Sequence, residues 1–415
     1  MGVFGYGVEG RATVRRLSSL TDDLVLVDDH PVDEGVLPTG GGGFEALATC
    51  EVVLKSPGIP RRREDVLALE DRGVTVTSAL NLWLHDIDRS RVIAVTGTKG
   101  KSTTTSLVAF FLRCVGAEAH ELGNIGTPPY DPDVDVTSGW LVLDISSFQS
   151  VDVTVAPAFV VVTSLGADHL DWHGSLERYH EDKLAITRAS GEHQTLVADT
   201  PELAHALSRM GGRLSLVPAD TTGLARRLGL LGAHNDHNVA VALEVVARAT
   251  GRDVAGVRDA VDSRAGDFEP LRGRLTLVAT HRVDGGAVRF VDDGLATGPL
   301  PTLAALEVFK DEEVALIAGG YDRGVDYEEL VEALESREHV TTLVVIGPAG
   351  ERIASLCRRV PTRHAATMSA AVRTANDCLP RGGVVLFSPA APSFDAYKNW
   401  AERSDDFTSA ARSLS

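Results

Sequence analysis

Short runs of β-branched and aliphatic residues alternate with longer helix-like segments along most of the chain, which predicts an α/β fold with largely parallel sheets. Strands are predicted at residues 3–4, 24–29, 92–96, 140–145, 158–163, 288–291, 314–318, 342–346 and 384–388. Helices are predicted directly after Gly10 and at residues 103–114, 175–189 and 235–250. The glycine run Gly40–Gly43 predicts a flexible loop.

Length, composition and charge narrow the class of protein. The chain has 415 residues, and at ~150 residues per domain this predicts two or three domains. Hydrophobic residues make up 44% and aromatic residues 5%, which is typical of a globular protein with aliphatic cores and excludes wholesale disorder and a fibrous repeat. The net charge of −18 repels polyphosphate backbones, so we expect no nucleic-acid partner.

The cysteines and the start of the chain bear on its location. The four cysteines are far apart and have no metal-ligand spacing, which favours a reducing cytoplasm. No segment approaches the ~18 uninterrupted apolar residues of a membrane span, and the start lacks the features of a signal peptide. We therefore expect a cytoplasmic protein without membrane insertion.

The first of two glycine-rich turns is Gly5-x-Gly7-x-x-Gly10, with Asp28 and Asp29 about 20 residues further on. This pattern matches the dinucleotide-binding fingerprint and by itself suggests a dehydrogenase. Only residues 2–4 are available for the preceding strand, whereas ~5 residues are usual, so either this strand is short or the true start lies upstream. The alternative is that the glycines merely let the first helix pack on the strand.

The second turn is the stronger signal, because a β-branched strand at 92–96 runs into Gly97-Thr98-Lys99-Gly100-Lys101-Ser102-Thr103 and then a helix. Backbone N–H groups at the helix start can stabilise phosphate, Lys101 can neutralise the β/γ oxygens, and a hydroxyl can bind Mg²⁺. The longer phosphate-loop pattern is not met, since Val95 stands where its first glycine belongs. A chance Gly-Lys-Ser loop is the alternative.

The chain resembles a known family, the Mur ligases, which build the peptide stem of bacterial cell-wall precursors. Residues 96–103 are similar to the ATP loop of that family. Further similar phrases follow in the family's order at residues 56–59, 123–126, 144–149, 168–171, 232–238 and 388–395. The resemblance covers essentially the whole chain and is closest to the branch that adds glutamate to UDP-N-acetylmuramoyl-L-alanine.

The resemblance implies a three-domain fold and a ligase reaction. The expected domains are a Rossmann-like N-terminal domain for the UDP substrate at 1–88, a central P-loop ATPase-like domain at 89–270, and a Rossmann-like C-terminal domain at 271–415. The expected reaction uses ATP and Mg²⁺ to convert the L-alanine carboxylate of UDP-N-acetylmuramoyl-L-alanine into an acyl phosphate, which the amine of glutamate then attacks. A monomer is expected.

The resemblance also assigns the ATP and metal site. The implied ATP-binding residues are Gly97, Thr98, Lys99, Gly100, Lys101, Ser102, Thr103, Asn238, Arg274 and Asp293, and His234 shares a helical face with Asn238. Ser102 (or Thr103), Asp144, His169 and Lys183, the last as a carbamate, are the implied metal ligands. Lys101, Lys183 and His169 are the implied catalytic residues. The family usually has Glu where this chain has Asp144, so this ligand is one methylene shorter.

The remaining implied residues bind the two other substrates. Gly7, Val8, Asp28, Ser56 and Asn81 match positions that hold the uridine diphosphate, and Asn124 matches a contact to the muramoyl group. Thr297, Arg323, Ser393 and Trp400 match the glutamate site.

Departures from the common pattern bear on the amino acid that is added. The familiar D-glutamate ligases carry a lysine at the position of Leu295, histidine at Gly273 and phenylalanine at Trp400. Arg323 replaces a glutamate-binding lysine and can hold a carboxylate bidentately. With Lys99 and the phrase at 168–175, these changes look more like the branch that ligates L-glutamate. Drift within a D-glutamate enzyme is the alternative.

Three other functions stay open from the sequence. An NAD-dependent dehydrogenase is one, and a folylpolyglutamate-type ligase that needs no uridine-binding domain is another. A non-catalytic paralogue is the third, because of Asp144, Leu295 and Gly273.

Overall fold

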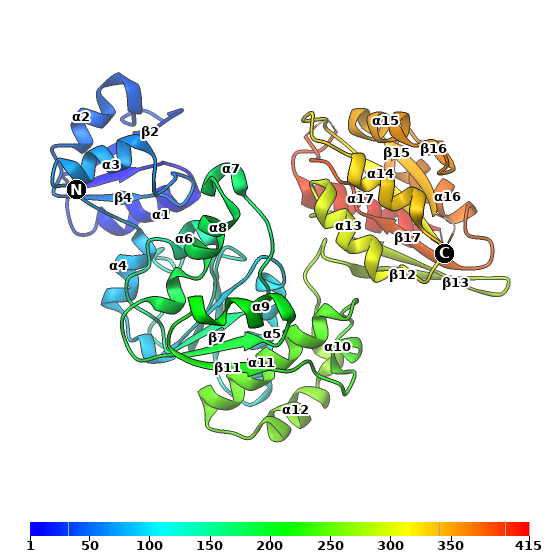
Figure 1. Ribbon diagram of the computed structural model, residues 1–415, viewed down its shortest axis with the longest axis horizontal. Coiled ribbons are helices and arrows are strands. Elements are labelled where there is room, and N and C mark those ends of the chain that lie inside the picture. The colour runs from blue at the N-terminus through cyan, green and yellow to red at the C-terminus, as the bar shows by residue number, and fades with distance from the viewer. Residues whose placement is uncertain (32, 340, 395, 415) are drawn as a thin grey trace. The chain divides into compact units, whose positions relative to one another are not determined.

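The computed structural model describes residues 1–31, 33–339, 341–394 and 396–414, so Asp395 of the last family phrase lies outside the described residues. The chain divides into two compact units, one of residues 1–224 and 234–265 and one of residues 225–233 and 266–415. Three sheets flanked by helices make up these units, which confirms the predicted α/β class (Figure 1). No helix of the described ranges is long and apolar enough to cross a membrane.

The first sheet is parallel with strand order β3-β2-β1-β4-β5. Its strands are β1 (Gly2–Phe4), β2 (Val25–Asp28), β3 (Leu37–Pro38), β4 (Val52–Lys55) and β5 (Thr75–Thr77), and its helices are α1 (Val8–Leu17), α2 (Phe44–Leu47), α3 (Glu64–Asp71) and α4 (Ala79–Asp86). The short strand β1 is central and pairs on both sides, so three residues suffice. The strand order changes direction at β1, which is where open α/β sheets bind ligands.

The segment Gly40–Gly43, predicted to be a flexible loop, forms a tight turn that leads into α2. Its backbone is non-helical at Gly41, with φ −101°, and at the left-handed Gly42, with φ 95°. A Cβ at Gly43 would lie 2.7 Å from the carbonyl oxygen of Pro38, so glycine is required for this close approach.

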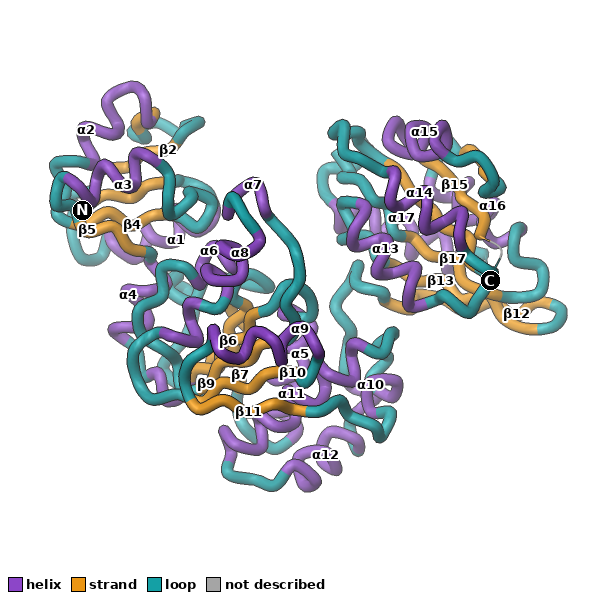
Figure 2. Tube along the Cα trace, viewed as in Figure 1, coloured by secondary structure: helices purple, strands orange, loops and turns teal. Residues whose placement is uncertain are grey.

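The central sheet is also parallel, with strand order β11-β10-β9-β6-β8-β7. Its strands lie among the helices of this part of the chain (Figure 2). Its strands are β6 (Val92–Thr96), β7 (Ala119–Gly123), β8 (Trp140–Asp144), β9 (Phe159–Val162), β10 (Gln194–Ala198) and β11 (Arg213–Val217). The helices are α5 (Lys101–Cys114), α6 (Ser147–Ser150), α7 (Leu170–His173), α8 (Leu176–Lys183), α9 (Pro201–Ala206), α10 (Leu224–Arg227), α11 (His234–Thr250) and α12 (Val254–Asp262).

The predicted elements of this domain are confirmed with two differences. Helix α5 begins two residues before its predicted start, because the left-handed Gly100 ends the loop directly before Lys101. The predicted helix at 175–189 is α8 followed by a separate 3-10 turn at Ala185–Arg188.

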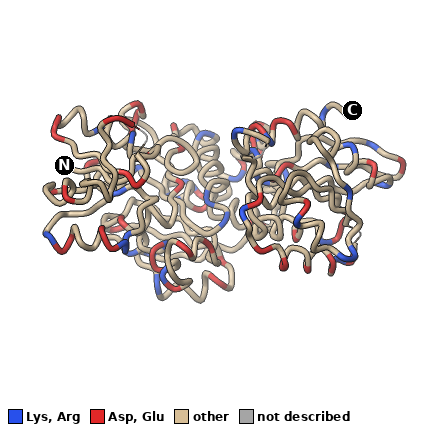
Figure 3. The backbone as a smooth tube through the Cα atoms, turned by 90° about the horizontal axis from the view of Figure 1, so that it is seen from above, with Lys and Arg blue, Asp and Glu red and all other residues tan. Residues whose placement is uncertain are grey.

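The third sheet has the order β12-β13-β17-β14-β15-β16 and is parallel except for the β12–β13 hairpin. Its strands are β12 (Thr276–Val283), β13 (Gly286–Asp292), β14 (Val314–Gly319), β15 (Thr341–Ile346), β16 (Thr362–His364) and β17 (Gly383–Phe387). The helices are α13 (Pro299–Val308), α14 (Glu328–Ser336), α15 (Gly347–Leu356), α16 (Met368–Asp377) and α17 (Trp400–Ser413). Acidic and basic residues are interspersed along the chain (Figure 3).

Candidate active site

The phosphate loop connects the buried strand β6 to the first residue of α5. Gly97 has φ 147°, and a Cβ there would lie 2.1 Å from Thr163 Oγ1. Gly100 has φ 84°, and a Cβ there would lie 2.6 Å from Asn238 Oδ1. Only glycine fits both positions, and the loop therefore brings its backbone N–H groups to the amino end of α5, where an anion is stabilised.

Side chains from two neighbouring segments hold this loop in shape. Thr98 Oγ1 accepts hydrogen bonds from the Tyr179 hydroxyl at 3.0 Å and from Gly166 N at 2.9 Å. Lys99 N donates to Ser164 Oγ at 2.8 Å, and Lys99 Nζ lies 3.4 Å from an Asp168 carboxylate oxygen. The predicted ATP-binding residue Thr98 thus uses its hydroxyl within the protein.

The ammonium group of Lys101 folds over the loop. Its Nζ donates to the carbonyl oxygens of Gly97 at 2.9 Å and Thr98 at 3.4 Å. This places a positive charge beside the backbone amides of the loop, as binding of a triphosphate requires.

Ser102 and Asp144 meet beside the loop. Ser102 Oγ donates to Asp144 Oδ2 at 2.7 Å, and both residues are buried. The second carboxylate oxygen, Asp144 Oδ1, is buried without a hydrogen-bond partner among the described residues. An unpartnered buried carboxylate oxygen is costly, and a bound cation would satisfy it. A hydroxyl and a carboxylate are ligands that suit Mg²⁺, so this pair fits the implied metal despite the shorter side chain of Asp144.

Lys183 lies at the end of α8 with its amine on the same loop. Its Nζ donates to the carbonyl oxygen of Gly97 at 2.9 Å and lies 4.9 Å from the ring centre of Tyr179. Burial, reinforced by the Lys101 ammonium, lowers the pKa of Lys183 well below its usual value, against the opposing charges of Asp168 and Asp144. A neutral amine of this kind can capture CO₂ as a carbamate.

His169 stands apart from this buried group. It begins α7 with a left-handed backbone at φ 49°, and its side chain is half exposed. Its ring centre lies 4.8 Å from that of Phe148, and its Nε2 lies 3.8 Å from Asp168 Oδ2. The structure therefore brings Lys101, Ser102, Asp144 and Lys183 together around the loop, and leaves His169 exposed at its margin.

Two further predicted residues flank the phosphate loop and β8. Asn238 is buried, donates from Nδ2 to Asn235 Oδ1 at 2.9 Å and packs on Gly100, whereas His234 begins the same helix and is exposed. Asn124 is exposed, and its backbone N donates to the Asp144 carbonyl oxygen at 2.9 Å.

The predicted uridine-diphosphate residues gather after β1. Asp28 accepts from Tyr6 N at 2.6 Å and His30 N at 2.8 Å, and Ser56 Oγ donates to the Gly5 carbonyl oxygen at 2.6 Å. Gly7 precedes α1 and is exposed, and Val8 is 78% exposed, which leaves an apolar surface at this loop. These contacts shape the loop at the carboxyl end of the sheet.

Asn81, which is predicted to contact the uridine diphosphate, makes three hydrogen bonds within the protein. Its Oδ1 accepts from Thr154 N at 2.8 Å and Thr154 Oγ1 at 3.0 Å, and its Nδ2 donates to Thr77 Oγ1 at 3.1 Å. The buried amide thus joins the first domain to the central domain.

The predicted glutamate residues lie on loops of the third sheet. Arg323 Nη2 donates to the Thr297 carbonyl oxygen at 3.0 Å, and Ser393 is buried. Gly273 packs against Trp400, since a Cβ at Gly273 would lie 2.8 Å from Trp400 Cζ3. Leu295 N donates to the Gly273 carbonyl oxygen at 3.1 Å, so three of the departures from the common family pattern form one packed cluster.

The predicted nucleotide residues of this domain differ in environment. Arg274 is exposed. Asp293 is buried, its Oδ2 accepts from Ser388 Oγ at 2.8 Å, and burial with the neighbouring charge of Asp292 raises the pKa of Asp293 to about 7. Burial likewise raises the pKa of Asp292 to about 6.

Comparison with known proteins places this site in a family. A UDP-N-acetylmuramoyl-L-alanine–L-glutamate ligase from a Micromonospora species is 38% identical over 99% of this chain and 96% of the relative. The chain belongs to the Mur ligase family. Residues 95–213 match the Mur ligase middle domain. A UDP-N-acetylmuramoylalanine–D-glutamate ligase from Symbiobacterium thermophilum is 34% identical over 100% of this chain and 98% of the relative.

Solved Mur ligases share the three-domain fold. A MurF ligase from Thermotoga maritima in complex with ADP has a TM-score of 0.58 at 16% identity, over 100% of this chain and 95% of that chain. A UDP-N-acetylmuramate–alanine ligase from the same organism has a TM-score of 0.53 at 18% identity, over 100% of this chain and 99% of that one. As a Mur ligase, the chain is an ATP-dependent enzyme that forms amide bonds.

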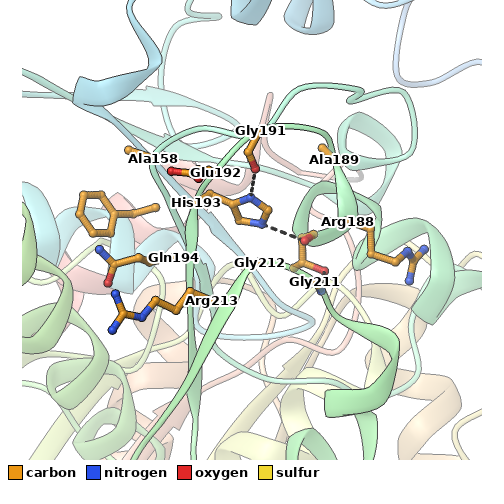
Figure 4. A pocket seen from close by; sticks show the side chains of 12 residues that line it. Ala158, Arg188, Ala189, Gly191, Glu192, His193, Gln194, Gly211, Gly212 and Arg213 are labelled. Carbon is orange, nitrogen blue, oxygen red and sulfur yellow. Dashed lines mark hydrogen bonds between the residues drawn. The ribbon is translucent and has the colours of Figure 1, made fainter.

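A cavity of about 850 Å³ in this Mur ligase lies away from the predicted residues (Figure 4). It opens where β9, β10 and β11 begin, whereas the phosphate loop follows the carboxyl end of β6 in the same parallel sheet. The His193 ring nitrogens each lie 2.9 Å from a carbonyl oxygen, of Gly191 and Thr187. Since ligands of such sheets bind at the carboxyl ends of strands, we do not assign the reaction to this cavity.

Sequence reasoning missed Arg403, which is buried on α17. Its guanidinium donates to the carbonyl oxygens of Ala391 at 2.9 Å, Pro392 at 3.0 Å and Gly319 at 3.4 Å. It thereby ties together the loops after β14 and β17, which carry Arg323 and Ser393. The nearest sequence signal is its position three residues after Trp400.

Proposed function

We propose that this Mur ligase joins L-glutamate to the L-alanine carboxylate of UDP-N-acetylmuramoyl-L-alanine in peptidoglycan precursor synthesis, converting ATP to ADP and phosphate. The observation that carries the proposal is the 38% identity with a ligase of this name over nearly the full length of both chains. A second relative of this name, from Salinispora tropica, is 35% identical over 99% of the chain. ATP and UDP-sugar substrates favour a cytoplasmic site of action, and the proposed domains remain 1–88, 89–270 and 271–415.

In the first step, the L-alanine carboxylate attacks the γ-phosphorus of ATP in line, ADP leaves, and an acyl phosphate forms. The amides of residues 97–103 and the Lys101 ammonium hold the phosphates, which favours the in-line arrangement and neutralises charge on the transferred oxygens. We assign Asn238, Arg274 and Asp293 to the nucleotide as well.

Ser102, Asp144, His169 and a carbamate on Lys183 would hold Mg²⁺. When bound, the ion supplies charge neutralisation at the phosphate oxygens. The depressed pKa of Lys183 supports the carbamate, since only the neutral amine reacts with CO₂. The unpartnered Asp144 Oδ1 supports the metal.

In the second step, the neutral amine of glutamate attacks the acyl carbon, the phosphate group leaves with the bonding electron pair, and the amine loses a proton. Thr297, Arg323, Ser393 and Trp400 are proposed to hold the glutamate. The guanidinium of Arg323 can bind one glutamate carboxylate through two parallel hydrogen bonds.

A second candidate is the same reaction with D-glutamate, because the Symbiobacterium relative bears that name. The contact of Gly273 with Trp400 and the replacement of the family lysine by Leu295 favour L-glutamate.

The test is phosphate release from ATP and Mg²⁺ with UDP-N-acetylmuramoyl-L-alanine and either enantiomer of glutamate. We expect turnover with L-glutamate. Turnover with D-glutamate alone would contradict the stereochemistry, and inactivity with both would contradict the ligase assignment. Binding of NAD without ATP turnover would support a dehydrogenase, and turnover of a folate in place of the UDP sugar would support a folylpolyglutamate-type ligase.

A further inference from the structure

Four side chains of the first unit form one continuous chain of hydrogen bonds. Ser147 Oγ lies 3.0 Å from His173 Nε2, and His173 Nδ1 lies 2.8 Å from Asp182 Oδ2. Arg62 donates from both terminal nitrogens to the two oxygens of Asp182, each at 2.8 Å. Ser147, His173 and Asp182 are buried, and the Arg62 side chain is 44% exposed. We call this set the Ser147–Arg62 relay.

The Asp182 carboxylate determines which atom donates and which accepts in each of these hydrogen bonds. The Asp182 carboxylate can only accept, so His173 carries a proton on Nδ1. Burial lowers the pKa of His173, which favours a neutral ring whose Nε2 accepts from the Ser147 hydroxyl. The relay is therefore satisfied throughout and fixes the orientation of each side chain.

The order serine, histidine, aspartate matches the arrangement of a nucleophilic triad. Ser147 is only 2% exposed, so an acyl substrate cannot reach its Oγ. The charge of Asp182 is also neutralised by Arg62 rather than reserved for an imidazolium. Both observations point to a positioning role instead of covalent catalysis.

The relay joins the elements that carry the proposed metal residues. Helices α6, α7 and α8 lie side by side (Figure 1). Ser147 begins α6 three residues after Asp144, and Asp182 directly precedes Lys183. His173 ends the helix that His169 precedes, and its ring stacks on Phe148 at 5.5 Å. The relay thus fixes the spacing of three segments that must converge on one cation.

Arg62 connects this arrangement to the first domain. It follows Ser56, a proposed UDP-substrate residue, in the loop between β4 and α3. Trp172 of α7 donates from Nε1 to the Gly58 carbonyl oxygen in the same loop at 3.2 Å. At the start of the loop, Lys55 forms a buried ion pair with Asp152 at 2.8 Å. The loop that carries Ser56 therefore contacts α7, α8 and Asp152 of the central domain.

We propose that Arg62, Asp182, His173 and Ser147 are positioning residues that couple binding of the UDP-sugar substrate to binding of the Mg²⁺–nucleotide. The proposal rests on the proposed function. Ser56 and Arg62 lie in one loop, so substrate bound at Ser56 stabilises the loop conformation that keeps the Arg62–Asp182 pair, and this pair holds α7 and α8 as the nucleotide site requires. By thermodynamic linkage, the nucleotide raises substrate affinity by the same factor.

The experiment measures by calorimetry the Kd of Mg²⁺ with a non-hydrolysable ATP analogue, with and without saturating UDP-N-acetylmuramoyl-L-alanine. In the wild type, we expect the substrate to lower this Kd by about fivefold or more. Arg62→Ala and Asp182→Asn should each bring this ratio close to one. Asp182→Asn keeps an oxygen for His173 and removes the charge for Arg62, so it tests the same link if Arg62→Ala folds poorly.

The matched control is Arg63→Ala. Arg63 is the neighbouring residue of the loop, but it pairs with Asp29 and Asp65 inside the first domain. This variant should retain the ratio of the wild type. The double variant Arg62→Ala/Asp182→Asn should lose no more than either single variant, because both remove one interaction.

Several outcomes would contradict the proposed coupling. One is that both Arg62→Ala and Asp182→Asn retain the wild-type ratio of nucleotide Kd values without and with substrate. Another is that the control Arg63→Ala loses this ratio to the same extent. A wild-type protein that binds both ligands, but whose nucleotide Kd does not change with substrate, would also contradict the coupling and would leave the ligase assignment intact. A wild type that binds neither ligand contradicts the proposed function itself.

Discussion

Two buried side chains beside the phosphate loop, Asp144 and Lys183, have polar atoms in unusual environments. Asp144 has one carboxylate oxygen on Ser102 and the other without a described partner, and the Lys183 amine is buried close to Lys101. Both arrangements cost folding free energy that a bound cation or a carbamate would recover. The sequence predicted these residues because each matches a position that the family resemblance assigns.

The environments of single residues were less predictable. The resemblance that assigned Asn81 could not reveal that its amide binds Thr77 and Thr154, since Thr154 is 73 positions away in the sequence. Beyond its position three residues after Trp400, the sequence does not point to Arg403, because its acceptors are backbone carbonyls of distant loops.

Asp293→Asn should flatten the pH dependence of stability between about pH 4 and 7. The folded-state pKa of Asp293 is raised to about 7 from 3.8, so over this window the native state binds more protons than the unfolded chain. Stability is therefore highest at the acid end and falls as the pH rises towards 7. An asparagine titrates nowhere in this range, so the variant should lose the part of the slope that Asp293 contributes, while Asp292, whose pKa is raised to about 6, retains its own part.

This change is measured by urea unfolding at several pH values without nucleotide. The control is Asp377→Asn, an exposed acid on α16. An unchanged slope in the Asp293 variant would show that its carboxyl group is already ionised at pH 4.

At the scale of elements, buried β-branched runs were the most predictable feature. Strands β6, β14 and β17 lie within about one residue of their predicted limits, because they are apolar on both faces. Strand β12 was missed, since its residues are only partly buried and include Thr280, His281 and Arg282. Helix α5 begins two residues before its predicted start at residue 103, because the sequence does not show that the backbone of Gly100 is left-handed.

Helix α1 offers a test of the first glycine-rich turn. A Cβ at Gly10 would lie 2.0 Å from the Gly5 carbonyl oxygen, and this backbone atom cannot move aside cheaply. Gly10→Ala should therefore lower the free energy of unfolding of the first unit by about 1–3 kcal/mol and weaken binding of UDP.

Gly7→Ala is the matched variant for stability. Gly7 has φ −75°, and a Cβ there meets no atom within 4 Å. Thermal melts should show a loss for Gly10→Ala and a nearly unchanged midpoint for Gly7→Ala. Equal midpoints in the two variants would mean that α1 can shift away from β1.

At the scale of the whole molecule, the three predicted domains correspond to three sheets but only two compact units. The first and central domains share the Lys55–Asp152 and Arg62–Asp182 ion pairs, which a sequence pattern cannot reveal. Partners 120 residues apart, as in the second pair, become neighbours only through the packing of whole domains.

Each unit has its own core, so scanning calorimetry should resolve two unfolding transitions. Arg403→Met should lower the midpoint of only the unit that holds the third sheet, by about 4 °C or more, because several buried carbonyl oxygens lose their donor. An exposed arginine of α17, Arg412, provides the control as Arg412→Met. A single unfolding transition, or an equal shift of both midpoints in Arg403→Met, would contradict the expectation that the two units unfold independently.

The packing of Trp400 on Gly273 constrains which residues these two positions can hold. While the indole is in place, any side chain at position 273 collides with it, and the left-handed backbone at φ 67° adds a further penalty. A side chain at position 273 therefore requires the indole to move, and a smaller residue at position 400 would remove the collision but not the backbone penalty.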